Sequence, residues 1–244
     1  MRRVLVLPSF NEERSLPPLL HRVEDLGVVD RVLVVDDGSK DRTAEVATTS
    51  LDHLPVQVLR HDTNHGLGTA MRTAFAALAA GPLDDDDAVI VMDADNTHDP
   101  ALIPQMCQAL QGADVVVASR YCPGGREFGL AWHRRILSRG ASALLRIARP
   151  VPGVRDYSCG YRAYRLGIIR RALTGGAESL ITTDGFACMA EILLRLHRLG
   201  ARCTEVPLAL HYERKEGPSK MKVAKTIRGY AAILRAVPPS RDQR

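Results

Sequence analysis

The sequence predicts a single α/β domain built on a mostly parallel sheet with helices on both faces. Short apolar runs alternate with amphipathic segments through residues 1–120, which is the pattern of right-handed βαβ units. The apolar runs are nearly continuous valine, leucine and isoleucine, as expected of strands buried on both faces. A chain of 244 residues with no long linker is the length of one large domain of this class.

The first half of the chain supplies most of the predicted sheet. Strands are expected at residues 3–8, 31–37, 56–61, 88–95 and 113–120, with helices at 12–27, 39–51, 66–81 and 100–111. The first helix has prolines near its start and a glycine at its end, the second begins with capping residues, and the third is rich in alanine. Each strand is therefore followed by a segment able to cross back over the sheet.

The pattern changes after residue 120. The stretch "PGGREFGLAW" predicts a loop, and a basic amphipathic helix is expected at 133–149. The following "RPVPGVRDYSCGYRAYR" is rich in turn residues. A helix is then predicted at 183–199, a strand at 202–210, a polar segment at 211–222 and a last helix at 223–237. Residues 238–244 form a polar tail.

Composition excludes several classes of protein. The formal charge is only +5 and aromatic residues make up 5% of the chain, so the basic and aromatic surface of a nucleic-acid reader is not predicted. The five cysteines contain no CxxC pair, which indicates reduced thiols in a cytoplasmic protein rather than a zinc site or disulfides. No window approaches the roughly 18 apolar residues that span a bilayer. Contact with the inner face of a membrane is therefore expected to be peripheral.

The stretch "VIVMDADNTHDP" at residues 89–100 carries two carboxylates, Asp93 and Asp95, at the end of a buried strand. Like charges converge when a divalent cation compensates their repulsion, and oxygen ligands suit Mg²⁺ or Mn²⁺. Such ions keep positions for phosphate oxygens, so a diphosphate is the expected third component. The alternative is a pair of exposed turn residues, with Asp95 starting an Asx-turn.

A second pair of carboxylates, Asp36 and Asp37, ends the second strand in "VVDDGSKDRT". Ligands of open α/β sheets bind at these carboxyl ends, where acidic side chains can accept hydrogen bonds from a base or a ribose. The alternative role of this segment is helix capping by Ser39 and Asp41. The sequence has neither GxGxxG after the first strand nor GxxxxGK[ST], which argues against redox-cofactor and P-loop proteins.

The motifs taken together resemble family 2 glycosyltransferases, which have the GT-A fold. They are, in chain order, "LPSFNEE", "VVDDGSKDRT", "NHGLGTAMRTA", "MDADNTHDP", "ASRY", "RRILSRGAS", "CGYRAYR" and "GPSKM". Within that family they look most like polyprenyl-phosphate (dolichyl-phosphate) mannosyltransferases and glucosyltransferases, over about residues 3–225. The resemblance implies one Rossmann-like domain at 1–237, with a nucleotide-sugar-binding half at 1–120 and an acceptor-binding half at 121–237.

The resemblance also implies roles for individual residues. The nucleotide sugar would contact Pro8, Asn11, Glu12, Asp36, Asp37, Gly68, Asp93, Ala94 and Asp95, and Asp93 and Asp95 would hold Mg²⁺ or Mn²⁺. The acceptor phosphate would be received by Arg120, Arg134, Ser138, Arg214 and Lys220. Those placed in the catalytic machinery are Asp95, Arg120, Arg134 and Arg214. Thr97 stands where the family often has a metal-binding glutamine.

The expected reaction is inverting, metal-dependent transfer of a hexose from a nucleotide diphosphate sugar, such as GDP-mannose or a UDP-sugar, to polyprenyl phosphate. A phosphate acceptor is already anionic and needs no strong base, whereas a hydroxyl acceptor would require one, for which Asp156 and Asp184 are candidates. The alternatives are transfer to a soluble small molecule and a non-catalytic sugar-nucleotide-binding protein. A nucleotidyltransferase would carry a glycine-rich, lysine-containing N-terminal loop, which this sequence lacks.

The last helix is also a candidate for the membrane surface. Its periodicity places one apolar set on a single face: Val223, Ile227, Tyr230, Ala231, Leu234 and Val237. A basic amphipathic helix can lie on an anionic membrane, or the same face can pack on the domain core. The helix at 133–149 has the same two interpretations.

Overall fold

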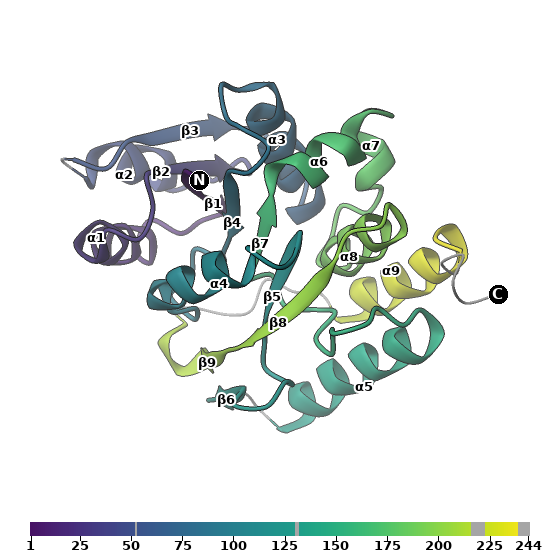
Figure 1. The fold of residues 1–244 in the computed structure, drawn as a ribbon. Helices are drawn as coiled ribbons and strands as arrows, with labels where there is room; N and C mark the ends of the chain where they lie inside the picture. Colours follow the sequence, from purple (N-terminus) through teal and green to yellow (C-terminus); the bar gives the residue numbers. More distant parts are fainter. Residues whose placement is uncertain (52, 130–131, 216–222, 239–244) are drawn as a thin grey trace.

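The structure of the protein, a computed structural model, describes residues 1–51, 53–129, 132–215 and 223–238. Its main feature is a seven-stranded sheet in the order β3-β2-β1-β4-β7-β5-β8 (Figure 1). The strands are β1 (Arg3–Ser9), β2 (Arg31–Asp36), β3 (Val56–Arg60), β4 (Ala88–Val91), β5 (Val115–Ser119), β7 (Arg162–Arg165) and β8 (Cys203–Pro207). β7 runs antiparallel to both of its neighbours, and the other pairings are parallel. The predicted mostly parallel sheet is confirmed.

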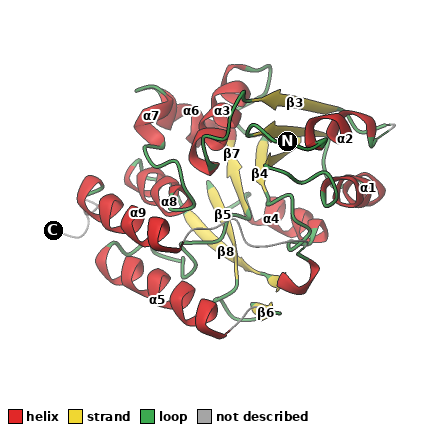
Figure 2. Ribbon diagram, turned by 180° about the vertical axis from the view of Figure 1, so that it is seen from behind, coloured by secondary structure: helices red, strands yellow, loops and turns green. Residues whose placement is uncertain are grey.

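Helices cover both faces of this sheet (Figures 1 and 2). One layer contains α1 (Leu16–Leu26), α2 (Thr43–Thr49), the short helix η1 (Pro100–Leu102) and α4 (Ile103–Ala109). The other contains α3 (Leu67–Ala80), α6 (Leu166–Leu173), α7 (Ala177–Leu180), α8 (Cys188–Arg198), α9 (Val223–Ala236) and α5 (Trp132–Ala148). No helix in the described part of the chain has the length and apolar content needed to cross a bilayer.

The central strands are buried because helices lie on both sides of them. Every residue of β4 and of β5 is buried, and so is the run Val4–Leu7 of β1. Burial on both faces removes the alternation of polar and apolar residues that a one-sided sheet shows. The strand ends therefore stand out chemically, since polar side chains appear there at Ser9, Asp36 and Asp93.

The predicted strand at 202–210 is two strands. β8 ends at Pro207, and β9 (Ala209–His211) pairs with β6 (Arg126–Phe128) in a separate two-stranded sheet. The short helix η2 (Tyr212–Arg214) follows β9 directly. This small sheet carries the chain from the edge of the main sheet back toward the loop after β4, where the backbone N–H of His211 donates to the carbonyl of Thr97 at 3.0 Å.

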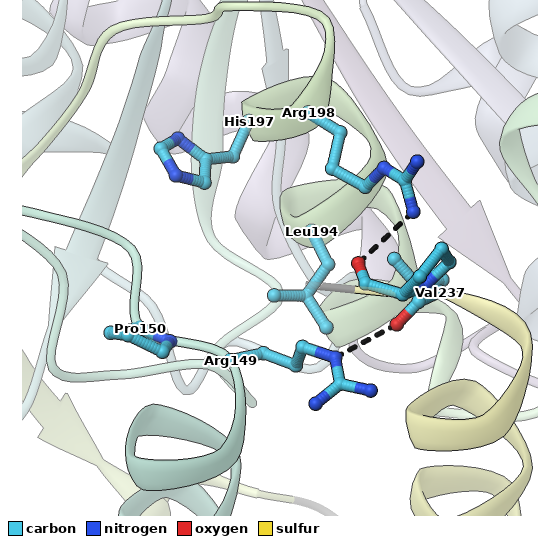
Figure 3. Close-up of a pocket in the computed structure, with 7 residues that line it drawn as sticks. Arg149, Pro150, Leu194, His197, Arg198 and Val237 are labelled. Carbon is cyan, nitrogen blue, oxygen red and sulfur yellow. Dashed lines mark hydrogen bonds between the residues drawn. The ribbon is translucent and has the colours of Figure 1, made fainter. Parts of the chain in front are cut away.

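The last helix packs on the domain core, and its predicted apolar face is correct only in part. Among the described side chains, Thr226, Tyr230 and Ile233 of α9 and Val237 just after it are buried, and Leu234 packs against the core, whereas Ile227 and Ala231 are exposed. Arginine side chains also fix the end of this helix (Figure 3): Arg149 donates to the carbonyl of Val237 at 2.8 Å and Arg198 to that of Pro238 at 3.0 Å. These donors satisfy carbonyls that a helix C-terminus leaves without partners. The crevice between them is about 10 Å³, too small for a ligand.

Candidate active site

The loop after β4 brings Asp93 and Asp95 to the carboxyl edge of the sheet, beside the end of β1. Asp95 is only 10% exposed at its side chain, and both of its oxygens are engaged. The Thr97 hydroxyl donates to Oδ1 at 2.6 Å, and the Lys215 ammonium donates to Oδ2. Burial acts to raise the pKa of Asp95, but Lys215, His98 and Thr97 outweigh it and hold the pKa below its ordinary value. Thr97, which stands where the family often has a metal-binding glutamine, orients this carboxylate.

Asp93 is the more accessible carboxylate, with 37% of its side chain exposed. Its surroundings raise its pKa, first through burial and then through the negative charge of Asp95. The imidazole of His98 opposes that increase from 4.0 Å, held in place against the ring of Tyr161 at 5.1 Å between centroids. Gly160 lies against the carboxylate, since a side chain there would begin 3.2 Å from Oδ1 of Asp93. Asp93 therefore carries an incompletely compensated negative charge.

Lys215 supplies the cation of this cluster, and the sequence did not predict it. The residue directly follows η2, and its side chain is 13% exposed. Burial acts to lower the pKa of Lys215, but Asp95, Asp93 and Glu12 together raise it. The side chain thus remains an ammonium ion among carboxylates from β4's loop and from the loop after β1. Lys215 is 120 residues from Asp95 in the chain, and no spacing links them.

The residues present fit a divalent cation of the magnesium type. Asp93 and Asp95 offer hard carboxylate oxygens, and a lysine ammonium already stands in as the cation on one of them. Across the described ranges, no group of three or more His, Cys, Asp or Glu side chains forms a complete metal cluster. Mg²⁺ commonly takes one or two carboxylates from the protein and completes its shell with water and substrate phosphates. The pair is therefore a partial site of the kind that a diphosphate completes.

The second strand end places Asp36 and Asp37 in different roles. Asp37 is buried and accepts from His61 Nδ1 at 2.7 Å and from the backbone N–H groups of His65 at 3.0 Å and Gly66 at 2.7 Å. It therefore holds the loop that leads into α3. Asp36 is fully buried, accepts from Ser39 N–H at 3.0 Å through Oδ1, and pairs through Oδ2 with Nε of Arg60 at 3.2 Å. Both carboxylates are therefore engaged by the protein itself.

The remaining residues expected at the nucleotide sugar line the same edge. Pro8 lies at the end of β1, opposite Val35 of β2. Asn11 has a left-handed backbone, with φ of 52°, and its side-chain oxygen accepts from Lys40 N–H at 2.9 Å. Ala94 is buried between the two aspartates. At Gly68 the close approach is to the protein itself, since a Cβ would lie 1.8 Å from the carbonyl oxygen of Thr183.

The arginine predicted at the end of β5 is tied to a buried carboxylate. Arg120 donates to Asp156 from Nε at 2.7 Å and from Nη2 at 2.8 Å, and also to Ser158 at 2.7 Å. Burial acts to raise the pKa of Asp156, but the Arg120 guanidinium overcomes it and holds the pKa below the ordinary value. Ser138 lies in the same cluster, 2.9 Å from the Tyr121 hydroxyl. Arg120 and Ser138 thus lie in one cluster, linked through Ser158.

The other predicted acceptor residues are less closely placed. Arg214 lies in η2, next to Lys215, and its side chain is exposed. The backbone of Arg134 lies in α5, beside the turn that contains Ser138, while its side chain is outside the described part. Lys220 lies outside the described residues altogether.

The two candidate bases are both engaged. Asp156 forms the buried ion pair with Arg120, so it is unavailable as a proton acceptor. Asp184 is half exposed and pairs with Arg72 at 2.8 Å. A hydroxyl acceptor would therefore find no unengaged carboxylate among these two.

Comparison with known proteins agrees with this geometry. The family model for glycosyl transferase family 2 matches residues 4–173. Undecaprenyl-phosphate mannosyltransferase of Micrococcus luteus is 36% identical over 223 residues, covering 91% of this chain and 88% of that protein. Polyprenol monophosphomannose synthase of Mycolicibacterium smegmatis is 32% identical, covering 90% and 81% respectively. Dolichol-phosphate mannosyltransferase of Pyrococcus furiosus is 33% identical, and the chain spans 62% of its length.

Solved structures support the fold. Glucosyl-3-phosphoglycerate synthase from Mycobacterium tuberculosis, solved with Mn²⁺, UDP and phosphoglyceric acid, superposes with a TM-score of 0.68. The match covers 97% of this chain and 79% of that one at 22% identity. At this identity the likeness concerns the arrangement of the chain, which is the GT-A arrangement predicted from the sequence.

Proposed function

The chain belongs to glycosyl transferase family 2 and is a glycosyltransferase, and we propose that it transfers a hexose from a nucleoside diphosphate sugar to polyprenyl phosphate with inversion at the anomeric carbon. Mannose is the favoured sugar because the three relatives described above are named as mannosyltransferases or as a monophosphomannose synthase. The donor is GDP-mannose or a UDP-sugar.

The carboxylate pair Asp93 and Asp95, which we call the metal edge, carries this proposal. In the proposed enzyme Asp93 and Asp95 hold Mg²⁺ or Mn²⁺. The metal would neutralise the departing nucleoside diphosphate. Support comes from the protein's own chemistry, since Asp95 binds an ammonium ion and Asp93 keeps an incompletely compensated charge. Thr97 keeps Asp95 in orientation.

The engaged bases favour a phosphate as the acceptor. A hydroxyl nucleophile would have to lose a proton to a nearby base, whereas a phosphate monoester is already anionic near neutral pH. Asp156 is held by Arg120 and Asp184 by Arg72. Arg120 and Ser138 then define one side of the acceptor position, and Arg214 lies exposed on η2. Guanidinium groups suit this task because they bind phosphate oxygens in pairs.

The acceptor's identity can be tested directly. Purified protein is incubated with a panel of sugar nucleotides, with and without Mn²⁺, and with either undecaprenyl phosphate in detergent or soluble phosphorylated metabolites. Mass spectrometry of the products identifies the sugar and the acceptor. We expect a mannosyl polyprenyl phosphate that requires the metal. Product formed only on a soluble acceptor, or no product with any donor, would contradict the proposal.

A further inference from the structure

The imidazole of His98 is buried beside Asp93 at the metal edge. Only 4% of the residue is exposed, and Nδ1 has no hydrogen-bond partner among the described residues. Buried polar atoms are rarely left in this state in native proteins, so the nitrogen calls for an explanation. Nδ1 is the ring nitrogen that faces Asp93, at 4.0 Å from Oδ2. This separation exceeds the roughly 2.7–3.2 Å of a hydrogen bond between nitrogen and oxygen.

The same separation suits one metal ion shared by the two atoms. Zn²⁺ lies about 2.0–2.2 Å from an imidazole nitrogen or a carboxylate oxygen, and other divalent ions of the first transition series are similar. Two such bonds together span at most about 4.2 Å. The 4.0 Å between Nδ1 of His98 and Oδ2 of Asp93 is therefore too long for a hydrogen bond and within the reach of a shared ion.

The loop after β4 holds the backbone of His98 in this position. Asn96 has a left-handed backbone, with φ of 61°, which is uncommon for a residue other than glycine. Its side-chain amide donates to the carbonyl of Ser15 at 2.8 Å and so fixes the turn. On the other side, the backbone N–H of His211 donates to the carbonyl of Thr97 at 3.0 Å. His98 is thus presented by a segment that is tied to two other parts of the chain.

The ring of His98 is also held in orientation. It packs on the ring of Tyr161, with the planes inclined by 30°. The Tyr161 hydroxyl donates to the carbonyl of Asp99 at 3.0 Å, and the Asp99 carboxylate pairs with Arg22 at 2.8 Å. Metal-binding imidazoles are typically oriented by contacts of this kind around them.

The neighbouring donors are used by the protein itself. The Thr97 hydroxyl and the Lys215 ammonium engage the two oxygens of Asp95, and within the described ranges Asp95 completes no three-residue cluster with Asp93 and His98. Nδ1 of His211 lies 2.7 Å from the carboxylate of Glu213. His98 therefore adds to the metal edge a donor atom that the described residues do not use.

We propose that Nδ1 of His98 is a ligand of the metal ion at the metal edge, which then presents one nitrogen and two carboxylates. This inference rests on the proposed function only in that the same ion serves the sugar nucleotide. The carboxylates alone suit Mg²⁺ and Mn²⁺ equally. Because Mg²⁺ prefers oxygen ligands and transition ions accept imidazole more readily, the nitrogen gives the site a preference for Mn²⁺.

Pulsed electron paramagnetic resonance of bound Mn²⁺ tests this ligand in the full chain. The protein is kept in excess over Mn²⁺ and inorganic pyrophosphate, which stands for the diphosphate and contains no nitrogen. Samples with ordinary histidine are compared with samples labelled with ¹⁵N at histidine only, so that lysine and backbone nitrogens do not change. We expect a coupling from a directly bound nitrogen that changes with the label. Bound Mn²⁺ without such a coupling would overturn the proposal.

Two variants assign the nitrogen. His98→Phe keeps a ring against Tyr161 but removes Nδ1, and it should abolish the coupling. The matched control is His211→Phe, whose native ring is also packed on an aromatic side chain, Phe128, and which should retain the coupling. The opposite result for either variant would place the nitrogen elsewhere and refute the role of His98. If His98→Phe does not fold, the labelled wild type and the control variant still decide the question.

Metal affinities provide a second readout. His98→Phe should bind Mn²⁺ at least about tenfold more weakly, the lower value for losing even an outer contact of a metal site. Mg²⁺, measured by its competition with Mn²⁺, should lose much less. Equal losses for both ions would indicate a role in packing alone and would contradict the proposal. Sugar transfer without any divalent ion would instead count against the proposed function, whereas bound Mn²⁺ without a histidine nitrogen overturns only the role of His98.

Discussion

Replacing Lys215 with methionine tests the metal edge most directly. Methionine keeps much of the length of the side chain but removes the ammonium ion from Asp95. Both partners are nearly buried, at 13% and 10% exposure, and removing one partner of a buried ion pair costs about 3–5 kcal/mol. Because both side chains keep some exposure, we expect the lower end, about 3 kcal/mol. For a chain of this size, that lowers Tm by about 6–12 °C in the absence of metal.

A divalent cation should reverse this loss. Since the ammonium and the metal would both bind Asp95, removing the ammonium eliminates its competition with the metal. A difference of about 3 kcal/mol corresponds to an upper limit of roughly a hundredfold tighter binding of Mn²⁺. Thermal unfolding with and without Mn²⁺ measures the stability change, and the electron paramagnetic resonance signal of free Mn²⁺ measures the affinity.

Two matched variants complete the experiment. Lys40→Met removes an exposed ammonium and should behave as wild type, and Lys215→Arg keeps the positive charge and should keep weak metal binding. The reasoning fails if Lys215→Met unfolds at the wild-type temperature without metal, or if it binds Mn²⁺ no more tightly than the wild type does.

Three further predictions concern Asp95, Asp156 and Gly68. Asp95→Ala should abolish the tightening of nucleoside diphosphate binding by Mn²⁺ in calorimetry while the fold is retained, and an unchanged effect of Mn²⁺ would remove Asp95 from the metal site. Asp156→Asn should cost about 3–5 kcal/mol in urea unfolding because it leaves the Arg120 guanidinium buried without its partner. The folded-state pKa of Asp156 is lowered, so its contribution is present above its ordinary pKa and is lost as pH falls through the folded value. Stability should therefore fall less steeply below about pH 4 in this variant than in wild type, and parallel curves would contradict that assignment. Gly68→Ala should destabilise by about 1–3 kcal/mol, since its Cβ would overlap a backbone carbonyl, whereas Gly112→Ala, with open space around it, should not; equal stabilities would refute the contact.

The strands of the alternating βαβ pattern could be predicted from the sequence. β7, which is inserted antiparallel between β4 and β5, could not. β1 to β5 lie within a few residues of their predicted positions because each is a short run rich in apolar residues between segments of helical periodicity. β7 is the four residues "RAYR", which carry two arginines and sit in a stretch dominated by turn residues. Arg162 is nonetheless fully buried, where it donates to the carbonyls of Tyr157, Cys159 and Met189. The sequence pattern does not predict β7, because the burial of this strand depends on hydrogen bonds from its own Arg162 and not on an apolar period.

In the candidate site, too, the residues that are close in sequence could be predicted and the contacts between distant loops could not. Motif spacing identified Asp93 and Asp95 because two carboxylates ending one strand are local in sequence. It could not identify Lys215 or the engagement of Asp37 by His61, since both depend on contacts between loops that meet only in the folded chain. These partners determine which carboxylate oxygens the protein already uses. They come from distant parts of the chain, so the sequence alone does not identify them.

The inserted strand also explains how the two halves of the site keep their relative position. The loop that leads into β7 holds Arg120 through Asp156 and reaches Asp93 through Gly160. These loop positions are four residues apart, so their Cα atoms can be separated by at most about 14 Å. β7 then pairs with β4, whose end leads to Asp93, and with β5, whose end leads to Arg120. One short loop and one antiparallel strand thus fix the distance between the metal edge and the acceptor side. The proposed in-line displacement needs donor and acceptor held at a set separation, which this connection would provide.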